Sequence, residues 1–139
     1  MQTPGVGAVI RYAYLWAADA ERGREEGVKD RPCAVVITAT DEDGALQLYV
    51  LPITHSPPDA ADLAVELPLA TKQRLGLDDQ RSWIVTREYN RFIWPGPDIR
   101  PNASGEAVIG NLPASLIERA IANLRLHATA NSISRAVRD

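Results

Sequence analysis

The sequence is poor in cysteine and histidine, with one cysteine, Cys33, and two histidines among 139 residues. A single cysteine excludes an internal disulfide and favours a reducing cytoplasm as the compartment. Two histidines and one thiol argue against a clustered zinc site, so neither a metal nor another cofactor is expected. No apolar run approaches the length of a membrane span, and residues 1–7 lack the charged and apolar regions of a signal peptide. We therefore expect no membrane segment.

The sequence also lacks an excess of positive charge. Lysine and arginine number 15 against 18 aspartate and glutamate residues, which gives a net charge of −3. Proteins that hold duplex nucleic acid by overall charge are basic, so any nucleic-acid site here must be a local basic patch. Hydrophobic residues make up 45% of the chain, enough for one core without disulfides. We expect a single domain over residues 1–139.

Hydrophobic patterning in the first half of the chain predicts three strands. Residues 6–16 are apolar at every even position, which is the period of a strand with one buried face. Residues 33–37 are apolar without alternation, which indicates a strand buried on both faces. An acidic turn that ends at Gly44 connects this strand to residues 46–54 in a predicted hairpin. Pro52 interrupts the last strand and favours a sheet edge or a bulge there.

The second half of the chain predicts further short strands and a helix. The predicted strands are 63–67, 81–88, its extension 92–94, and 107–109. A helical turn over 68–75 ends at Gly76, and a rigid, proline-rich loop spans 94–100. Apolar residues at helical spacing predict a helix over 113–129, and the tail 130–139 either frays or extends it. Together these elements predict a mainly β fold, a small antiparallel barrel with a C-terminal helix.

Arg31 stands at the entrance of the buried strand, directly before Pro32. The proline ring fixes its own φ angle and pushes Arg31 toward an extended backbone. A guanidinium held at the mouth of a rigid strand is well placed to bind a phosphate or a carboxylate. Arg31 is therefore a candidate functional residue, and the alternative is a structural salt bridge at the strand entrance.

Short motifs occur along the chain in an order that resembles a known family. They are Gly23-Arg24-Glu25-Glu26-Gly27, Arg31-Pro32, Leu51-Pro52-Ile53-Thr54 and Gly110-Asn111-Leu112-Pro113. By their order and spacing, the chain resembles the PemK/MazF toxins of bacterial type II toxin–antitoxin systems. The resemblance implies an SH3-like or CcdB-like barrel, a homodimer, and a metal-independent, sequence-specific endoribonuclease that cleaves single-stranded RNA. It also implies a cognate antitoxin whose partly disordered segment covers the RNA groove.

Residue by residue, the resemblance assigns candidate catalytic groups. Arg31 and Thr54 match the family's catalytic arginine and threonine, and Glu25 best matches the acid of its glycine-bounded loop. Glu88 matches a later acid that one branch of the family uses. His55 is a further candidate base, because the ordinary imidazole pKa of about 6.5 suits proton transfer near neutral pH.

Four residues are candidates for binding RNA. Arg31 can grip a phosphate through two N–H donors, and Ser56, Arg87 and Arg91 are the other candidates. Tyr89 and Trp94, with Arg91, offer a stacking platform for unpaired bases, although packing is the alternative for both aromatic residues.

Two other hypotheses remain open at this point. The acidic charge, and Val6-Gly7-Ala8-Val9 in place of the family's Arg-Gly-acid opening, favour a non-catalytic barrel. Such a barrel would bind a protein target, as a CcdB-like gyrase poison or as a regulatory module. The third hypothesis is a structural barrel without a site, in which Arg31, Thr54 and Glu25 lie far apart.

Overall fold

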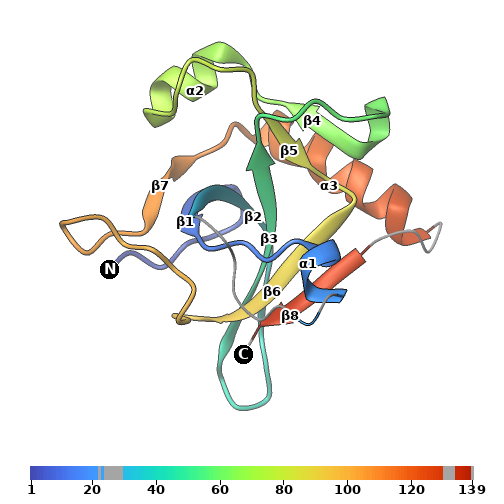
Figure 1. The fold of residues 1–139 in the computed structure, drawn as a ribbon. Helices are drawn as coiled ribbons and strands as arrows, with labels where there is room; N and C mark the ends of the chain where they lie inside the picture. Colours follow the sequence, from blue (N-terminus) through green and yellow to red (C-terminus); the bar gives the residue numbers. More distant parts are fainter. Residues whose placement is uncertain (22, 24–29, 130–133, 139) are drawn as a thin grey trace.

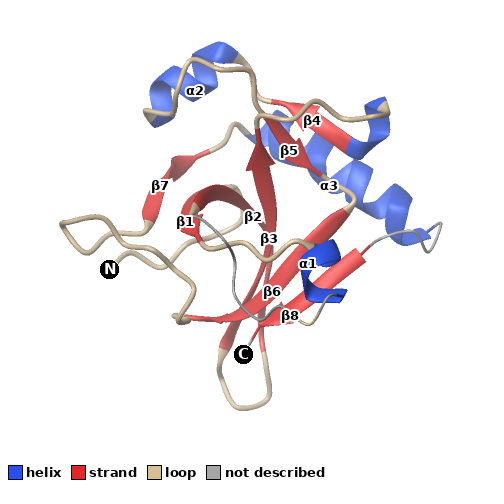
Figure 2. Ribbon diagram, in the orientation of Figure 1, coloured by secondary structure: helices blue, strands red, loops and turns tan. Residues whose placement is uncertain are grey.

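The structure is a computed structural model and describes residues 1–21, 23, 30–129 and 134–138. Its elements are β1 (Ala8–Tyr12), α1 (Ala17–Glu21), β2 (Arg31–Thr40), β3 (Leu46–Thr54), a 3₁₀ helix η1 (Ala61–Leu63), β4 (Ala64–Glu66), α2 (Leu69–Leu75), β5 (Trp83–Val85), β6 (Glu88–Trp94), β7 (Val108–Asn111), α3 (Ala114–Thr129) and β8 (Ser134–Arg138). One sheet joins all the strands, and α3 lies against it (Figures 1 and 2). The mainly β, barrel-like fold with a helix near the C-terminus, predicted from the sequence, is confirmed.

β3 is the central strand of the sheet. The strand order is β4-β5-β3-β2-β1-β7, and β6 pairs with β3 and with β8. On the side of β3 that faces away from β2, β6 pairs with residues 46–50 and β5 pairs with Ile53 and Thr54. Pro52 lies between these two paired segments, where a missing N–H is tolerated. The prediction of a sheet edge at Pro52 is therefore wrong, because β3 has partners on both sides.

Alternate residues of β2 enter two different apolar clusters. Ala34 and Val36 belong to a cluster on one face of the sheet, and Cys33 and Val35 belong to a cluster on the other face. The predicted burial of this strand on both faces is confirmed for these four residues. The first cluster lies under α3, and the second cluster lies on the opposite face and includes Tyr12, Leu48 and Phe92.

β1 is also buried on both faces, so the prediction of one buried face for residues 6–16 is wrong. Val9 packs into the cluster under α3, while Ile10 and Tyr12 pack into the second cluster. Ile99 of the loop after β6 packs into the second cluster and forms a backbone bridge with Tyr12, on the face that was predicted to be buried. The other face is buried because Val9 lies under α3. A strand that is covered on its second face no longer needs polar residues at alternate positions.

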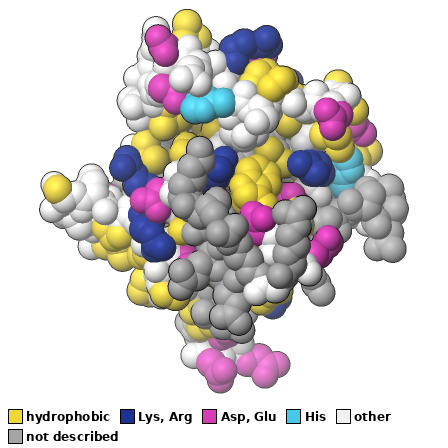
Figure 3. All heavy atoms as spheres, viewed as in Figure 1, with side chains coloured by type: hydrophobic (Ala, Val, Ile, Leu, Met, Phe, Trp, Pro, Cys, Tyr) yellow, Lys and Arg dark blue, Asp and Glu magenta, His cyan; other side chains and the backbone are white. Residues whose placement is uncertain are grey.

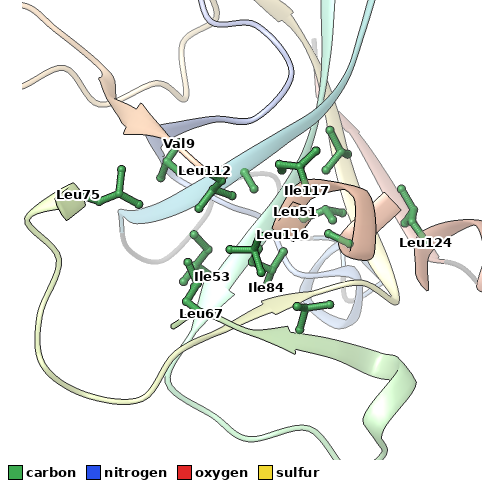
Figure 4. Packing of buried hydrophobic residues seen from close by; sticks show 14 residues of the cluster. Val9, Leu51, Ile53, Leu67, Leu75, Ile84, Leu112, Leu116, Ile117 and Leu124 are labelled. Carbon is green, nitrogen blue, oxygen red and sulfur yellow. The ribbon is translucent and has the colours of Figure 1, made fainter. Parts of the chain in front are cut away.

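α3 confirms the helix predicted over 113–129. Its buried residues Leu116, Ile117, Ala120 and Leu124 recur at helical spacing. Figure 4 shows Leu116 and Ile117 beside residues of the sheet such as Leu51. Each of the larger side chains contributes about 1.5–3 kcal/mol by leaving water. No helix in the described part of the chain is long and apolar enough to cross a membrane.

The tail after α3 contains a strand, so the prediction of a frayed or extended helix over 130–139 is wrong for residues 134–138. β8 pairs in parallel with β6, with Ala136 opposite Asn90. β6 has a second edge that is not used by β3, and pairing there satisfies backbone groups of both segments. This pair is also the one departure from antiparallel pairing among the described strands.

Candidate functional site

A cleft of about 570 Å³ opens at the end of the sheet where β2 begins and β3 ends. β2 and β3 are antiparallel, with Cys33 opposite Pro52, so Arg31 and Thr54 reach the same end of the pair. Both residues line the cleft, together with Trp16, His55 and Ser56. The structure thus brings four residues selected from the sequence into one concavity: Arg31, Thr54, His55 and Ser56.

The guanidinium of Arg31 stacks on Trp16. Its central carbon lies 5.0 Å from the centroid of the indole ring, which is a favourable cation–π distance. Its Nε is buried and has no hydrogen-bond partner among the described residues. Within the described part of the chain, no carboxylate forms an ion pair with Arg31. The guanidinium therefore lies over the indole ring, and no described carboxylate forms an ion pair with it.

Two residues of β6 hold the segment that carries Trp16. Glu88 is buried, and its Oε1 accepts hydrogen bonds from the Tyr14 hydroxyl at 3.1 Å and from the Ala17 N–H at 3.0 Å. Asn90 forms two hydrogen bonds with the backbone of Leu15, at 2.9 and 2.8 Å. Burial raises the pKa of the Tyr14 hydroxyl, and the negative charge of Glu88 raises it further. The geometry gives Glu88 a structural role beside the cleft.

Thr54 is the last residue of β3 and pairs with Trp83, and His55 and Ser56 follow it. The Oγ1 of Thr54 accepts a hydrogen bond from the Ser56 N–H at 3.2 Å. The hydroxyl proton of Thr54 remains able to donate to a ligand, since a hydroxyl both accepts and donates. The Nε2 of His55 lies 2.7 Å from Oδ2 of Asp78, and both side chains are about half exposed at the rim of the cleft. The rim therefore carries a hydroxyl and an imidazole–carboxylate pair.

Lys72 and Asp78 line the cleft, and neither was predicted from the sequence. Lys72 lies on α2 with its side chain only 2% exposed, and its Nζ donates to Oδ1 of Asp78 at 2.6 Å and to the Gln80 carbonyl. The Lys72 ammonium, with smaller help from His55, holds the pKa of Asp78 below its usual value. One sequence signal was present: Lys72 stands three residues before the buried Leu75, on the same face of the helix.

The other selected residues lie elsewhere. Arg87 lines a neighbouring cavity of about 230 Å³ that shares Trp16, Thr54 and Ser56 with the cleft. Glu88 and Arg87 line a third cavity of about 440 Å³ that also includes Trp16. Arg91 is half-buried on β6 and lines none of these three cavities. Glu25 lies outside the described residues.

The aromatic platform considered for Tyr89 and Trp94 is a packing arrangement. Trp94 is buried in the second cluster beside Phe92, and Tyr89 packs against Tyr49 with their ring centroids 5.4 Å apart. Trp16 lines the cleft, although the sequence predicted it only as a strand residue. Burial raises the pKa of the Cys33 thiol, which is consistent with an inert core residue.

The surface chemistry around the site is mixed in sign. Acidic and basic side chains are interspersed among the coloured residues on the face drawn in Figure 3. Among the described residues, no group of three or more His, Cys, Asp and Glu side chains could hold a metal ion. What the described groups can do is bind an anionic oxygen through Arg31 and Thr54 and transfer a proton through His55.

No protein-family model matches this chain, and no curated protein matches it in sequence. A function is therefore inferred from the geometry of the cleft and from the order of the sequence motifs.

Proposed function

We propose that the protein is the toxin of a type II toxin–antitoxin system and a metal-independent endoribonuclease that cleaves single-stranded RNA. The observation that carries the proposal is the common cleft of Arg31 and Thr54, with a guanidinium edge that pairs with no described carboxylate. Such a pair of groups can bind a phosphodiester, because the two anionic oxygens can accept hydrogen bonds from a guanidinium and a hydroxyl at the same time.

The reaction that fits these groups is attack by the ribose 2′-OH on the neighbouring phosphate. The 2′ oxygen forms a bond to phosphorus, and the bond from phosphorus to the 5′ oxygen breaks. The products are a 2′,3′-cyclic phosphate and a free 5′-OH. Arg31 stabilises the charge that grows on the phosphate oxygens, Thr54 donates a hydrogen bond to one of them, and His55 takes the proton of the 2′-OH.

An unpaired strand fits the site better than a duplex. The cavity lined by Arg87 adjoins the cleft and shares Trp16, Thr54 and Ser56 with it, so it offers room for a nucleotide next to the cleaved phosphate. Proteins hold unpaired strands with local cations and aromatic faces, and these contacts do not require a basic surface overall. The net charge of −3 is compatible with recognition of this kind.

The motif resemblance adds the biological part of the proposal. It implies a cytoplasmic homodimer that inhibits growth until a cognate antitoxin binds it. A partly disordered antitoxin segment would compete with RNA for the same groove, which gives a simple means of inhibition.

Cleavage of a mixed pool of single-stranded RNAs in the presence of EDTA tests the proposal. We expect the wild-type protein to cut the pool and Arg31→Ala to be slower by about 100-fold or more. Arg119→Ala is the control, because Arg119 is exposed on α3 away from the cleft residues. Expression should arrest growth for the wild type and the control, and not for Arg31→Ala.

Two outcomes would contradict the proposal. One is wild-type protein that leaves varied RNAs intact over a long incubation. The other is growth arrest that persists undiminished in Arg31→Ala, which would support the non-catalytic barrel that binds a protein target.

A further inference from the structure

The carboxylate of Asp78 accepts hydrogen bonds on both of its oxygens. Oδ1 accepts from Lys72 Nζ at 2.6 Å and from the Gln80 N–H at 3.1 Å. Oδ2 lies 2.7 Å from Nε2 of His55. Two donors thus fix Oδ1 and set the plane of the carboxylate, and Oδ2 is directed to the imidazole.

The end of α2 explains how these groups meet. Gly76 ends the helix in the left-handed region, with a φ angle of 71°, and the Leu77 N–H donates to the Lys72 carbonyl at 2.9 Å. The chain therefore folds back over Lys72, and the next residue, Asp78, reaches the rim of the cleft. The Lys72 ammonium also donates to the Gln80 carbonyl, which closes the turn.

Lys72 is not available to bind a phosphate directly. Its side chain is 2% exposed, and its Nζ is engaged by an oxygen of Asp78 and by the Gln80 carbonyl. Burying an ammonium costs several kcal/mol unless it is well paired, so an apolar residue would be the cheaper choice for this helix position. The buried ammonium instead pairs with Asp78 and holds that carboxylate in place beside His55.

We propose that Lys72 and Asp78 position His55 as the base of the cleavage reaction, an inference that rests on the function proposed above. An ionised carboxylate only accepts hydrogen bonds, so Nε2 of His55 carries the proton in its bond to Asp78. In the neutral ring Nδ1 is then unprotonated and is the nitrogen that accepts a proton. Lys72 and Asp78 touch no reacting atom, and both are positioning residues.

The proton balance of the step follows from this tautomer. The 2′-OH gives its proton to Nδ1 of His55 as its oxygen bonds to phosphorus. The bond to the 5′ oxygen breaks with its electron pair on that oxygen, which takes a proton from water. The hydroxide so formed takes the proton from Nδ1, and the neutral ring is restored. Asp78 stabilises the imidazolium while it exists.

A double-mutant cycle tests whether Asp78 acts through His55. Single-turnover rates and KM are measured for wild type, His55→Gln, Asp78→Asn and the double variant. We expect each single variant to lower kcat by about 100- to 1,000-fold with KM little changed, and the double variant to be no slower than His55→Gln. Lys72→Met should lower kcat in the same way, and Asp79→Asn, an exposed neighbour, should not. Losses that multiply in the double variant would overturn the proposal.

Nitrogen-15 spectra of the imidazole rings test the positioning without any cleavage. His55 is identified by the signal that His55→Gln removes, and the spectra are recorded at alkaline pH on protein shown to be folded. We expect the Nε2–H tautomer in the wild type and a mixture of tautomers in Asp78→Asn. Identical tautomer populations in both proteins would overturn the proposal. A third outcome is that the tautomer populations differ between wild type and Asp78→Asn but the wild type cuts no RNA. This outcome would overturn the proposed function and would still support the positioning of His55 by Asp78.

Discussion

The guanidinium of Arg31 lies over the indole ring of Trp16, with its central carbon 5.0 Å from the ring centroid. Trp16 is held in turn by Glu88 and Asn90, which bind the backbone on either side of it. Neither of these two residues lines the cleft, so β6 supports the cleft indirectly, by holding the segment that carries Trp16. In the proposed reaction the guanidinium binds a phosphate through its N–H groups, so the indole that supports it would contribute to that binding.

Trp16→Ala should lower the kcat/KM for RNA cleavage because Arg31 loses its support. A cation–π contact is worth about 0.5–2 kcal/mol, which corresponds to a loss of about 2- to 30-fold. Trp16→Phe keeps an aromatic face and should lose less. The measurement is kcat/KM on one RNA for the three proteins, after circular dichroism has shown the same fold. Equal values for Trp16→Ala and the wild type would show that Arg31 does not need the indole.

Glu88→Ala should lower the free energy of unfolding by about 1–3 kcal/mol, because the buried Tyr14 hydroxyl and Ala17 N–H lose their acceptor. Glu88→Gln keeps an acceptor oxygen and should lose less. Glu118→Ala, exposed on α3, is the control and should change stability by no more than about 0.5 kcal/mol. Urea unfolding measures the free energy of unfolding of the three variants and of the wild type. A Glu88→Ala protein that is as stable as the wild type yet inactive would instead give Glu88 a catalytic role.

Features that depend on neighbouring residues could be predicted from the sequence. The hairpin between β2 and β3 follows from a turn in which Gly44 adopts a φ angle of 82°, and Asp41 accepts hydrogen bonds from the backbone of that turn. The convergence of Arg31 and Thr54 then follows from antiparallel pairing alone, since one residue begins β2 and the other ends β3. The turn sequence and the antiparallel pairing rule were therefore enough to predict that these two residues meet.

Features that depend on packing between distant parts of the chain could not be predicted from the sequence. The second buried face of β1, that of Val9, exists because α3 covers it, and nothing in the spacing of residues 6–16 announces this cover. The pairing of β8 requires an open edge on β6, which only the assembled sheet reveals. Asp78 meets His55 because α2 ends and reverses at Gly76, so no spacing in the sequence relates the two residues.

Asp78 should make the stability of the fold depend on pH in the acidic range. The Lys72 ammonium, followed by His55, holds the pKa of Asp78 below its usual value. A lowered pKa in the folded state stabilises the fold above the unfolded pKa of about 3.9, and this contribution is lost as the pH falls through the folded pKa. The stability difference between wild type and Asp78→Asn should therefore shrink from about pH 5 downward.

Urea unfolding at several pH values measures this difference, and Asp79→Asn serves as the control. Asp79 is exposed and forms no ion pair with a described residue, so its substitution should show no such trend. A difference between wild type and Asp78→Asn that stays constant down to about pH 3 would show that the Asp78 carboxylate does not stabilise the fold through its charge.

Gly76→Ala should lower the free energy of unfolding through the backbone alone. Its φ angle of 71° lies in the left-handed region, which costs about 1–2 kcal/mol for a residue with a Cβ. An added Cβ would meet no atom within 4 Å, so no steric clash contributes. Gly5→Ala is a matched control, because its Cβ also meets nothing and its φ angle lies outside that region. Urea unfolding of both variants should show the loss only in Gly76→Ala, and equal stability of the two would mean that α2 ends equally well without the left-handed glycine.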